Sequence, residues 1–396
     1  MNRRHDLDWV RVFAFCLLVL YHVGMYYVSW DWHVNKVPAS TAIGPLMILS
    51  APWRLSLLFL VSGAAIAFML GKQPEGFMRA RSRRLLVPLV FGMLFIVPPQ
   101  AYYEVVEKLP GGYHDGYLAF WGRYLLADPS FCRGDDCLDL PTWNHLWFVA
   151  YAWVYTLFVW ACMRLAPQAG RRMAQRIARA LGGWGLLVWP ALYLVAARLA
   201  LFPVFDSTHG LFDDWYNHVQ YLGVFVIGFA IARSEQVWDT IEALRRVAGT
   251  IALACAGFLF WYFSAHQGDA PTPEMLRQCQ RVVWGVMQWS VIVAVLGFAR
   301  HSAPADSRAL RYLSAAVFPV YILHQTVTVV LAHNLKPFGI PSLLEGPLLV
   351  VATFALCLAG YEMIRRIGPL RPLFGLKRLR GDGAAAAAIA VPGSMR

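Results

Sequence analysis

Charged residues are scarce in this chain. Asp, Glu, Lys and Arg together make up 15% of its 396 residues, whereas a soluble domain typically carries about 25%. Hydrophobic residues account for 58%, and the mean hydropathy is +0.49. Apolar runs of about 20 residues, the length of a membrane-spanning helix, recur along the whole sequence. The composition therefore excludes an ordinary soluble domain and predicts an all-α integral membrane protein.

Cysteine is also rare, and seven cysteines are too few for a disulfide scaffold. Four of them fall inside apolar runs, where we expect inert packing: Cys16, Cys162, Cys255 and Cys357. Cys132 and Cys137 flank an acidic loop, CRGDDC, and can pair if this loop faces an oxidising compartment. A zinc site is the weaker alternative, because nearby His145 is the only plausible third ligand. We predict no metal site.

Further absences narrow the classes of function. The phosphate loop GxxxxGK[ST] does not occur, so an ATP-type phosphate site is not supported. No internal repeat of the kind that marks many transporters is visible. The net charge of +12 does not indicate a nucleic-acid partner, because the basic residues sit in short loops between apolar runs. The predicted partner is the lipid bilayer, with no nucleic acid.

The apolar runs predict about ten transmembrane helices around a central cavity. They cover residues 8–29, 43–70, 85–105, 143–164, 184–204, 217–232, 247–265, 281–299, 313–333 and 343–364. The first run starts with charged residues and lacks an A-x-A end, which predicts a retained helix and not a cleaved signal peptide. One transmembrane domain is expected over residues 1–380, followed by a low-complexity tail over 381–396.

Ten membrane spans place the loops alternately on the two sides of the membrane, and the basic residues are distributed unevenly between these sides. Of the 35 Lys and Arg residues, 25 fall on the side that holds both termini and seven on the other. The positive-inside rule then predicts a multi-pass protein with both termini in the cytoplasm. The CRGDDC loop falls outside, where a disulfide is plausible.

The first span carries two residues that a membrane helix disfavours, Arg11 and His22. They are eleven residues apart, which places them on one helix face, about 16.5 Å apart along the axis. An ionisable residue inside a membrane helix is costly, faces the protein interior and indicates a functional site. The alternative is that Arg11 extends to the headgroups and that His22 is a packed core histidine.

Other polar residues are expected at a similar depth. His324 lies in FPVYILHQ of the ninth span, and Arg54 lies in PWRLSLLFLVSG of the second. A central arginine costs about 2.5–3.5 kcal/mol unless it is paired or solvated, so we expect both residues to share a cavity with His22. The segment WNHLWF places His145 and Trp147 at the outer rim of this cavity. The alternative for His145 is an interfacial aromatic belt.

A cluster of arginines, FMRARSRRLL, precedes the third span. Arg81 and Arg84 are three residues apart and share a helix face. Because the guanidinium fork binds phosphates through two hydrogen bonds, this pair is a candidate anion site. The alternative is that the cluster only anchors the topology.

Taken together, these motifs resemble the membrane acyltransferase-3 family. Arg11 and His22 match its R-x10-H motif, and the other matches are VSG at 61–63, Phe77 with Arg81-x-x-Arg84 and Pro88, HLWF at 145–148 and YILH at 321–324. Within the family the chain looks most like the branch that succinylates osmoregulated periplasmic glucans. This finer resemblance is carried by DWHVN at 31–35 and YEMIRRIGPLRPLFGLK at 361–377.

The resemblance implies a bacterial inner-membrane O-acyltransferase. The donor would be acyl-CoA on the cytoplasmic side, with succinyl-CoA as the candidate that the finer resemblance suggests and with no permanently bound cofactor. The acceptor would be a hydroxyl of a periplasmic or envelope glycan, modified at or beyond the outer face. The pantetheine arm, on the order of 15–20 Å long, spans a distance comparable to the rise between Arg11 and His22.

Residue roles follow from the same resemblance. Arg81, Arg84 and Arg11 would hold the phosphates of coenzyme A, or Arg11 the thioester end. His22 would be the general base or a transient acyl carrier, and Arg54 or His324 would stabilise the tetrahedral oxyanion. Sugar contacts are expected from Trp32, Asn35, His145 and Trp147.

Two other classes compete with an acyltransferase. A transporter or flippase of an anionic glycan or lipid precursor would equally place Arg and His near the midplane. The missing repeat and the cytoplasmic arginine cluster argue against it. A signalling or scaffold protein would leave the buried ionisable residues unexplained.

Overall fold

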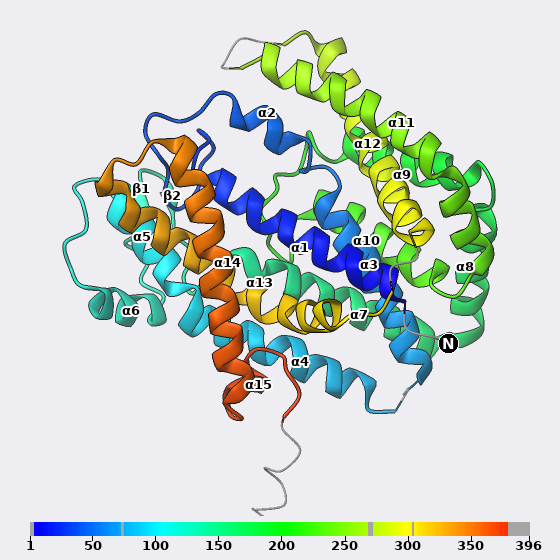
Figure 1. Cartoon of the computed structure of the whole chain (residues 1–396), viewed down its shortest axis with the longest axis horizontal. Coiled ribbons are helices and arrows are strands. Elements are labelled where there is room, and N and C mark those ends of the chain that lie inside the picture. Colours follow the sequence, from blue (N-terminus) through cyan, green and yellow to red (C-terminus); the bar gives the residue numbers. More distant parts are fainter. Residues whose placement is uncertain (1–3, 73–74, 268–271, 303–304, 379–396) are drawn as a thin grey trace, which may run out of the picture.

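The computed structural model describes residues 4–72, 75–267, 272–302 and 305–378. These residues form helices joined by loops and one small hairpin, β1 (Cys132–Arg133) paired antiparallel with β2 (Asp136–Cys137). The protein is an all-α integral membrane protein, as the composition predicts (Figure 1). The predicted tail over 381–396 lies outside the described residues.

Eight helical segments of the described chain are long and apolar enough to cross a bilayer. Five are single helices: α1 (His5–Met25), α3 (Arg54–Lys72), α11 (Glu235–Ala265), α12 (Glu274–His301) and α14 (Ser342–Arg366). The other three combine consecutive helices: α4 (Phe77–Phe91) with η1 (Gly92–Ile96) and α5 (Pro98–Lys108), η2 (Asn144–Leu146) with α7 (Trp147–Leu165), and α13 (Arg308–Leu335) with η3 (Lys336–Phe338).

Two of the ten expected spans are shorter than the bilayer core. Helices α9 (Gly185–Ala200) and α10 (Trp215–Ile231) contain 16 and 17 residues, which makes them about 24 and 26 Å long against a core of about 30 Å. A bend of 109° separates α9 from the basic helix α8 (Pro167–Ala180). Gly183 lies at this bend with φ of +55°, a conformation that suits glycine.

The second expected span, 43–70, is divided in the structure. It contains a short helix α2 (Ile43–Ile48), a break, and then α3. Pro52 lies in the break, where its missing N–H and its ring disfavour a continuous helix. The consequence for the site is that Arg54 stands at the first residue of α3 and not in the middle of a helix.

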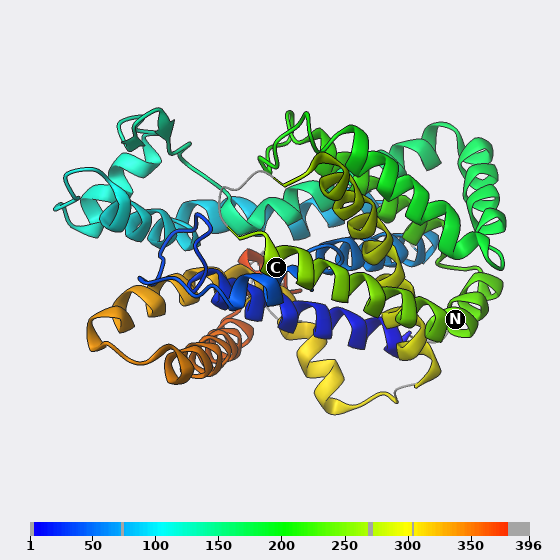
Figure 2. The same ribbon diagram turned by 90° about the horizontal axis from the view of Figure 1, so that it is seen from above.

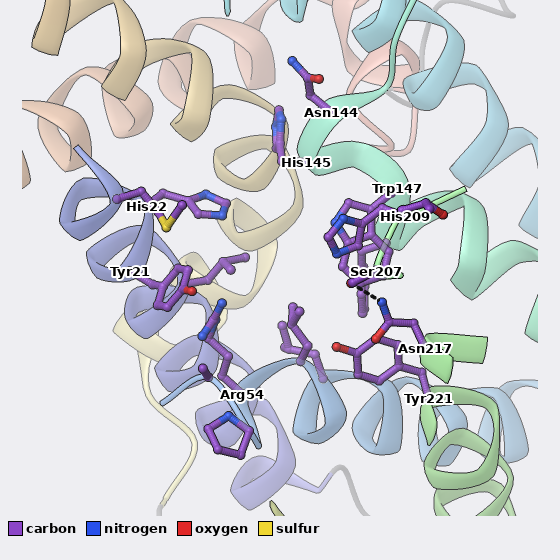
Figure 3. A pocket seen from close by; sticks show the side chains of 18 of the residues that line it. Tyr21, His22, Arg54, Asn144, His145, Trp147, Ser207, His209, Asn217 and Tyr221 are labelled. Carbon is purple, nitrogen blue, oxygen red and sulfur yellow. Dashed lines mark hydrogen bonds between the residues drawn. The ribbon is translucent and has the colours of Figure 1, made fainter. Parts of the chain in front are cut away.

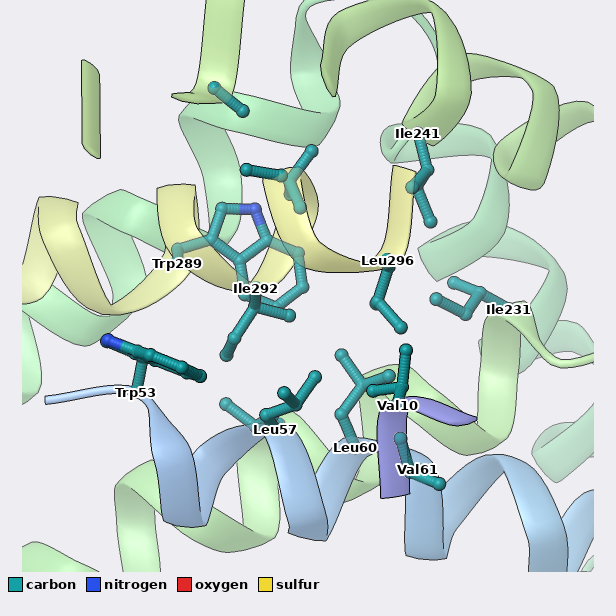
Figure 4. Packing of buried hydrophobic residues seen from close by; sticks show 14 of the residues in the cluster. Val10, Trp53, Leu57, Leu60, Val61, Ile231, Ile241, Trp289, Ile292 and Leu296 are labelled. Atoms are coloured by element: carbon teal, nitrogen blue, oxygen red, sulfur yellow. The ribbon is translucent and has the colours of Figure 1, made fainter. Parts of the chain in front are cut away.

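The largest core cluster joins α1, α3, α10, α11 and α12 (Figure 4). Because lipid tails are as apolar as leucine, these helices are held by close packing and not by the removal of apolar surface from water. Gly63 of α3 and Gly228 of α10 permit the closest approach. A Cβ atom at Gly63 would overlap the carbonyl of Phe225, and one at Gly228 would overlap the carbonyl of Leu60.

Helices α1 and α13 run side by side in the same direction through the bundle (Figure 1). At one end, which we call the hairpin end, α5, α6 (Tyr117–Leu125) and the β-hairpin lie together, and Figure 2 shows this group far from the N-terminus. The predicted disulfide between Cys132 and Cys137 is present there. The last helix, α15 (Leu370–Leu373), packs against α4.

Candidate active site

His22 of α1 and His324 of α13 are in direct contact. Nδ1 of His22 lies 2.7 Å from Nε2 of His324, and the two rings are parallel, with centroids 4.9 Å apart and an interplanar angle of 5°. His324 is fully buried, whereas His22 is half-buried and lines the main cavity. The two histidines that the sequence places on different spans therefore form one unit.

The hydrogen bonds assign the protons of this pair. Nδ1 of His324 lies 2.7 Å from the carbonyl of Tyr321, which can only accept, so this nitrogen carries the hydrogen. In a neutral ring Nε2 of His324 is then the acceptor, and Nδ1 of His22 donates to it. The lone pair of His22 is left on Nε2, and within the described residues no hydrogen bond engages that atom.

His145 packs against this pair and also lines the cavity, with both of its ring nitrogens engaged in hydrogen bonds. Its Nε2 donates to the carbonyls of Tyr321 and Ile322 at 3.1 and 3.2 Å, and its Nδ1 accepts from Gln100 at 3.4 Å. Its ring stands perpendicular to that of His324, with centroids 5.2 Å apart. The Tyr321 hydroxyl donates back to the His145 carbonyl. His145 thus holds the turn of α13 that presents His324.

A second group of hydrogen bonds supports the same turn from the hairpin end. The Gln325 amide donates to Nε2 of His33 at 2.9 Å and to Oε1 of Gln100 at 3.0 Å. Nδ1 of His33 in turn lies 2.5 Å from the carboxylate of Glu104. This chain of contacts ties the loop after α1 to α5 and α13, and so fixes the wall of the cavity beside His324.

The cavity has a volume of about 720 Å³, and its lining includes the loop residues 31–33 and 142–144. Figure 3 shows residues of α1 and α3 on one side of it, namely Tyr21, His22 and Arg54. The opposite side carries Trp147, Ser207, His209, Asn217 and Tyr221. The cavity is therefore bounded by segments that lie far apart in the sequence.

Arg54 enters the cavity beside His22. Its side chain is 6% exposed, and its guanidinium carbon lies 3.3 Å from the centroid of the Tyr21 ring. Its Nε and Nη1 are buried and have no hydrogen-bond partner among the described residues. A buried cation with free donors that faces a cavity is suited to bind developing or permanent negative charge.

The expected sugar-binding residues divide into two groups. Trp32 and Trp147 both line the cavity, and the Trp147 ring lies over His209 at 4.4 Å between centroids. Asn35 does not line it. The Asn35 amide donates to the carbonyls of Val28 and Trp30 at 3.1 and 3.0 Å and organises the loop after α1.

Several polar residues of the cavity escaped the sequence analysis. Arg198, Ser207, His209, Asn217 and Gln220 all line it. Four of these come from α10 and the loop before it, a region that has no charged residue in its apolar run to draw attention. Only Arg198, a charge within an apolar run, carried a usable signal.

The three arginines expected to hold the donor lie away from this cavity. Arg11 contacts Asp8 at 3.3 Å and the carbonyl of Ser314 at 3.5 Å, while Arg81 and Arg84 lie on α4. None of the three lines the cavity. The ring of Phe15 lies against Tyr321, 5.6 Å away, between the level of Arg11 and that of His22.

Comparison with known proteins agrees with this architecture. A family model described as an acyltransferase domain, acyltransferase-3, matches residues 4–362. The chain therefore belongs to the acyltransferase-3 family of membrane acyltransferases.

Individual relatives are more distant. The chain is 20% identical over 385 residues to proteins named glucans biosynthesis protein C from Escherichia coli O6:K15:H31 and from Escherichia coli K12. Each alignment covers 95% of this chain and 95% of the relative. No solved structure matches the chain.

Proposed function

We propose that this protein moves an acyl group, succinyl or acetyl, from cytoplasmic acyl-CoA to a hydroxyl of a periplasmic or envelope glycan. The inner membrane of a bacterium, with both termini in the cytoplasm, is the location that fits the distribution of basic residues. The main support is the His22–His324 pair, which leaves one basic nitrogen facing a cavity large enough for a sugar. Family membership supports the acyl transfer, and the name of the relatives supports a glucan acceptor.

His22 acts as the general base in this proposal. Nε2 takes the proton of the sugar hydroxyl as the oxygen attacks the thioester carbonyl, and the thiolate of coenzyme A leaves. His324 accepts the hydrogen bond from Nδ1 of His22 and stabilises the imidazolium that forms. The Tyr321 carbonyl keeps His324 in the required tautomer, a role comparable to that of the third residue of a catalytic triad.

The alternative role of His22 is that of a covalent carrier of the acyl group. Nε2 would attack the thioester, release coenzyme A and carry the acyl group until the sugar hydroxyl displaces it. In either route a tetrahedral oxyanion forms beside His22. Arg54 suits its stabilisation better than His324, because both nitrogens of His324 are already engaged, whereas Arg54 has two buried donors without partners.

The experiment that tests this function uses purified protein, radiolabelled acyl-CoA and isolated envelope glycan. Acyl transfer should appear as labelled glycan with release of free coenzyme A in equal amount. Mass spectrometry of envelope glycans from cells with and without the protein identifies the acyl group and the acceptor. A transporter or flippase would move glycan or precursor without forming coenzyme A, and that result would overturn the proposal.

A further inference from the structure

Arg198 of α9 is a buried cation that forms no salt bridge with any carboxylate of the described residues. It is 5% exposed and lines the cavity. Its Nη1 donates to the Tyr216 hydroxyl at 2.9 Å, and its Nε is buried with no hydrogen-bond partner among the described residues. Burying an arginine without a carboxylate is costly, so its retention here needs a reason.

Two aromatic rings hold this arginine in place. Its guanidinium carbon lies 4.0 Å from the ring centroid of Trp284 and 4.2 Å from that of Phe202. Contacts of this kind fix the plane of the guanidinium and satisfy its faces. The rings leave the edges of the guanidinium uncovered, and one edge donor, Nη1, already donates to Tyr216. An oxyanion binds such an edge through two hydrogen bonds.

The cavity as a whole is positively charged. Its charged lining residues in the described chain are Arg54, Arg198 and Asp31. Asp31 is engaged elsewhere, by Lys108 at 2.5 Å and by Arg133 at 3.2 Å. Burial alone would raise the pKa of Asp31, but these hydrogen bonds outweigh it and hold the pKa at about 2. Its negative charge is therefore already matched by Lys108 and Arg133.

Arg54 and Arg198 both line the cavity, as does Tyr221. Arg54 stands beside His22, whereas Arg198 is held by α10 and α12 on another side. One arginine is thus placed for the reaction, and the other is placed for a charge that the substrate brings with it.

We propose that Arg198 forms an anion subsite of the cavity, which binds a carboxylate or similar oxyanion carried by a substrate while the reaction occurs at His22. This rests on the acyl transfer proposed above. The oxyanion has two possible sources with the same chemistry: the free carboxylate of a dicarboxylic acyl group, or an anionic substituent of the glycan acceptor.

The test compares matched charged and neutral ligands on the purified full chain. Succinyl-CoA is paired with butyryl-CoA, in which a methyl group replaces the carboxylate, and an anionic glucan is paired with its neutral counterpart. Affinities are measured from the ligand-dependent rise in the unfolding temperature. We expect one charged ligand to bind wild-type protein at least about tenfold more tightly than its neutral match, as for a lost charge-assisted hydrogen bond.

The variant Arg198→Met keeps an unbranched side chain as far as the position of Nε but removes the guanidinium and its charge. It should abolish this preference without lowering the unfolding temperature, because it relieves a buried charge that forms no salt bridge in the described chain. Arg198→Lys should keep part of the preference. Arg277→Met, at an exposed arginine of α12 outside the cavity, is the control and should leave the preference unchanged.

The results separate the sources and the proposals. If Arg198→Met loses the preference for succinyl-CoA over butyryl-CoA, the bound carboxylate belongs to the acyl group. If it loses the preference for the anionic glucan over the neutral glucan, the bound oxyanion belongs to the acceptor. If no charged ligand is preferred, or if the preference survives in Arg198→Met, the subsite does not exist. Anion preference without acyl transfer in wild type would keep the subsite and reject the proposed function, whereas transfer without anion preference would do the reverse.

Discussion

Phe15 of α1 packs edge-on against Tyr321 of α13, with 5.6 Å between the ring centroids and an interplanar angle of 74°. The contact occupies the space between Arg11, which reaches the carbonyl of Ser314, and the pair of His22 and His324. In this conformation the cavity therefore does not extend to the arginines. An acyl chain that arrives from that side has to displace this aromatic layer.

Enlarging this layer should slow transfer without weakening donor binding. Phe15→Trp adds volume to a packed position, which typically costs about 1–3 kcal/mol, so we expect transfer to slow by about tenfold or more while the affinity for acyl-CoA stays the same. Phe13→Trp on the half-exposed side of α1 is the control. The single-turnover rate of acyl transfer and the equilibrium binding of acyl-CoA are measured for both variants. Equal rates in the two variants would show that the acyl chain takes another path.

Removing the basic nitrogen of His22 should abolish transfer and spare the fold. His22→Gln keeps much of the volume and polarity but cannot take a proton, and losing a general base costs about 10²–10⁴ in rate. Label transfer to glycan and the unfolding temperature are measured together. His218→Gln, at a histidine outside the cavity, is the control. If folded His22→Gln protein transfers the acyl group at a rate within a few-fold of wild type, His22 is not the general base and another residue has this role.

The arginines of α4 should govern donor affinity. Arg81→Ala with Arg84→Ala is expected to weaken acyl-CoA binding by at least about tenfold, because hydrogen bonds to charged groups contribute about 1.5–3 kcal/mol each. Direct binding of acyl-CoA to purified protein is the measurement. The control is Arg171→Ala with Arg172→Ala, which removes two exposed charges from α8. If both double variants bind alike, the α4 cluster only anchors the topology.

Glu345 should contribute strongly to stability. It is 1% exposed, pairs with Lys36 and accepts from the Tyr27 hydroxyl at 3.2 Å. Glu345→Gln leaves the Lys36 ammonium without its counter-charge, and we expect a loss of about 3 kcal/mol, the lower end for a broken buried pair. Glu274→Gln, which breaks an exposed pair with Arg277, should cost less than about 1 kcal/mol. If Glu345→Gln and Glu274→Gln lower the unfolding temperature by the same amount, the buried pair does not contribute more to stability than the exposed pair.

The orientation in the membrane has its own test. The uneven distribution of basic residues predicts that a reporter fused after Lys377 stays in the cytoplasm and that the Cys132–Cys137 loop is outside. The activities of a cytoplasmic and a periplasmic reporter are compared at Lys377 and, in a second fusion, in the CRGDDC loop. A periplasmic signal at Lys377 would invert the proposed path of the acyl group.

The class of fold and the family could be predicted from the amino-acid sequence alone, and so could the shared helix face of Arg11 and His22. Long apolar runs permit little except membrane helices, since backbone groups in lipid must be paired within the segment. An eleven-residue spacing places Arg11 and His22 on one face of any helix, and in the structure both contact α13. These properties depend on local periodicity, which a single sequence displays.

The packing of the helices was needed to show which polar residues meet and which nitrogen of His22 is free. The tautomer depends on His324 and the Tyr321 carbonyl, 302 and 299 positions along the chain from His22. His145 lines the cavity as expected, but its ring nitrogens hold α13. Asn35 does not line the cavity, and its amide holds the loop after α1. Arg198 became informative only when Trp284 and Phe202 were seen around it without a carboxylate. Such contacts join distant helices, and no local pattern encodes the packing that brings those helices together.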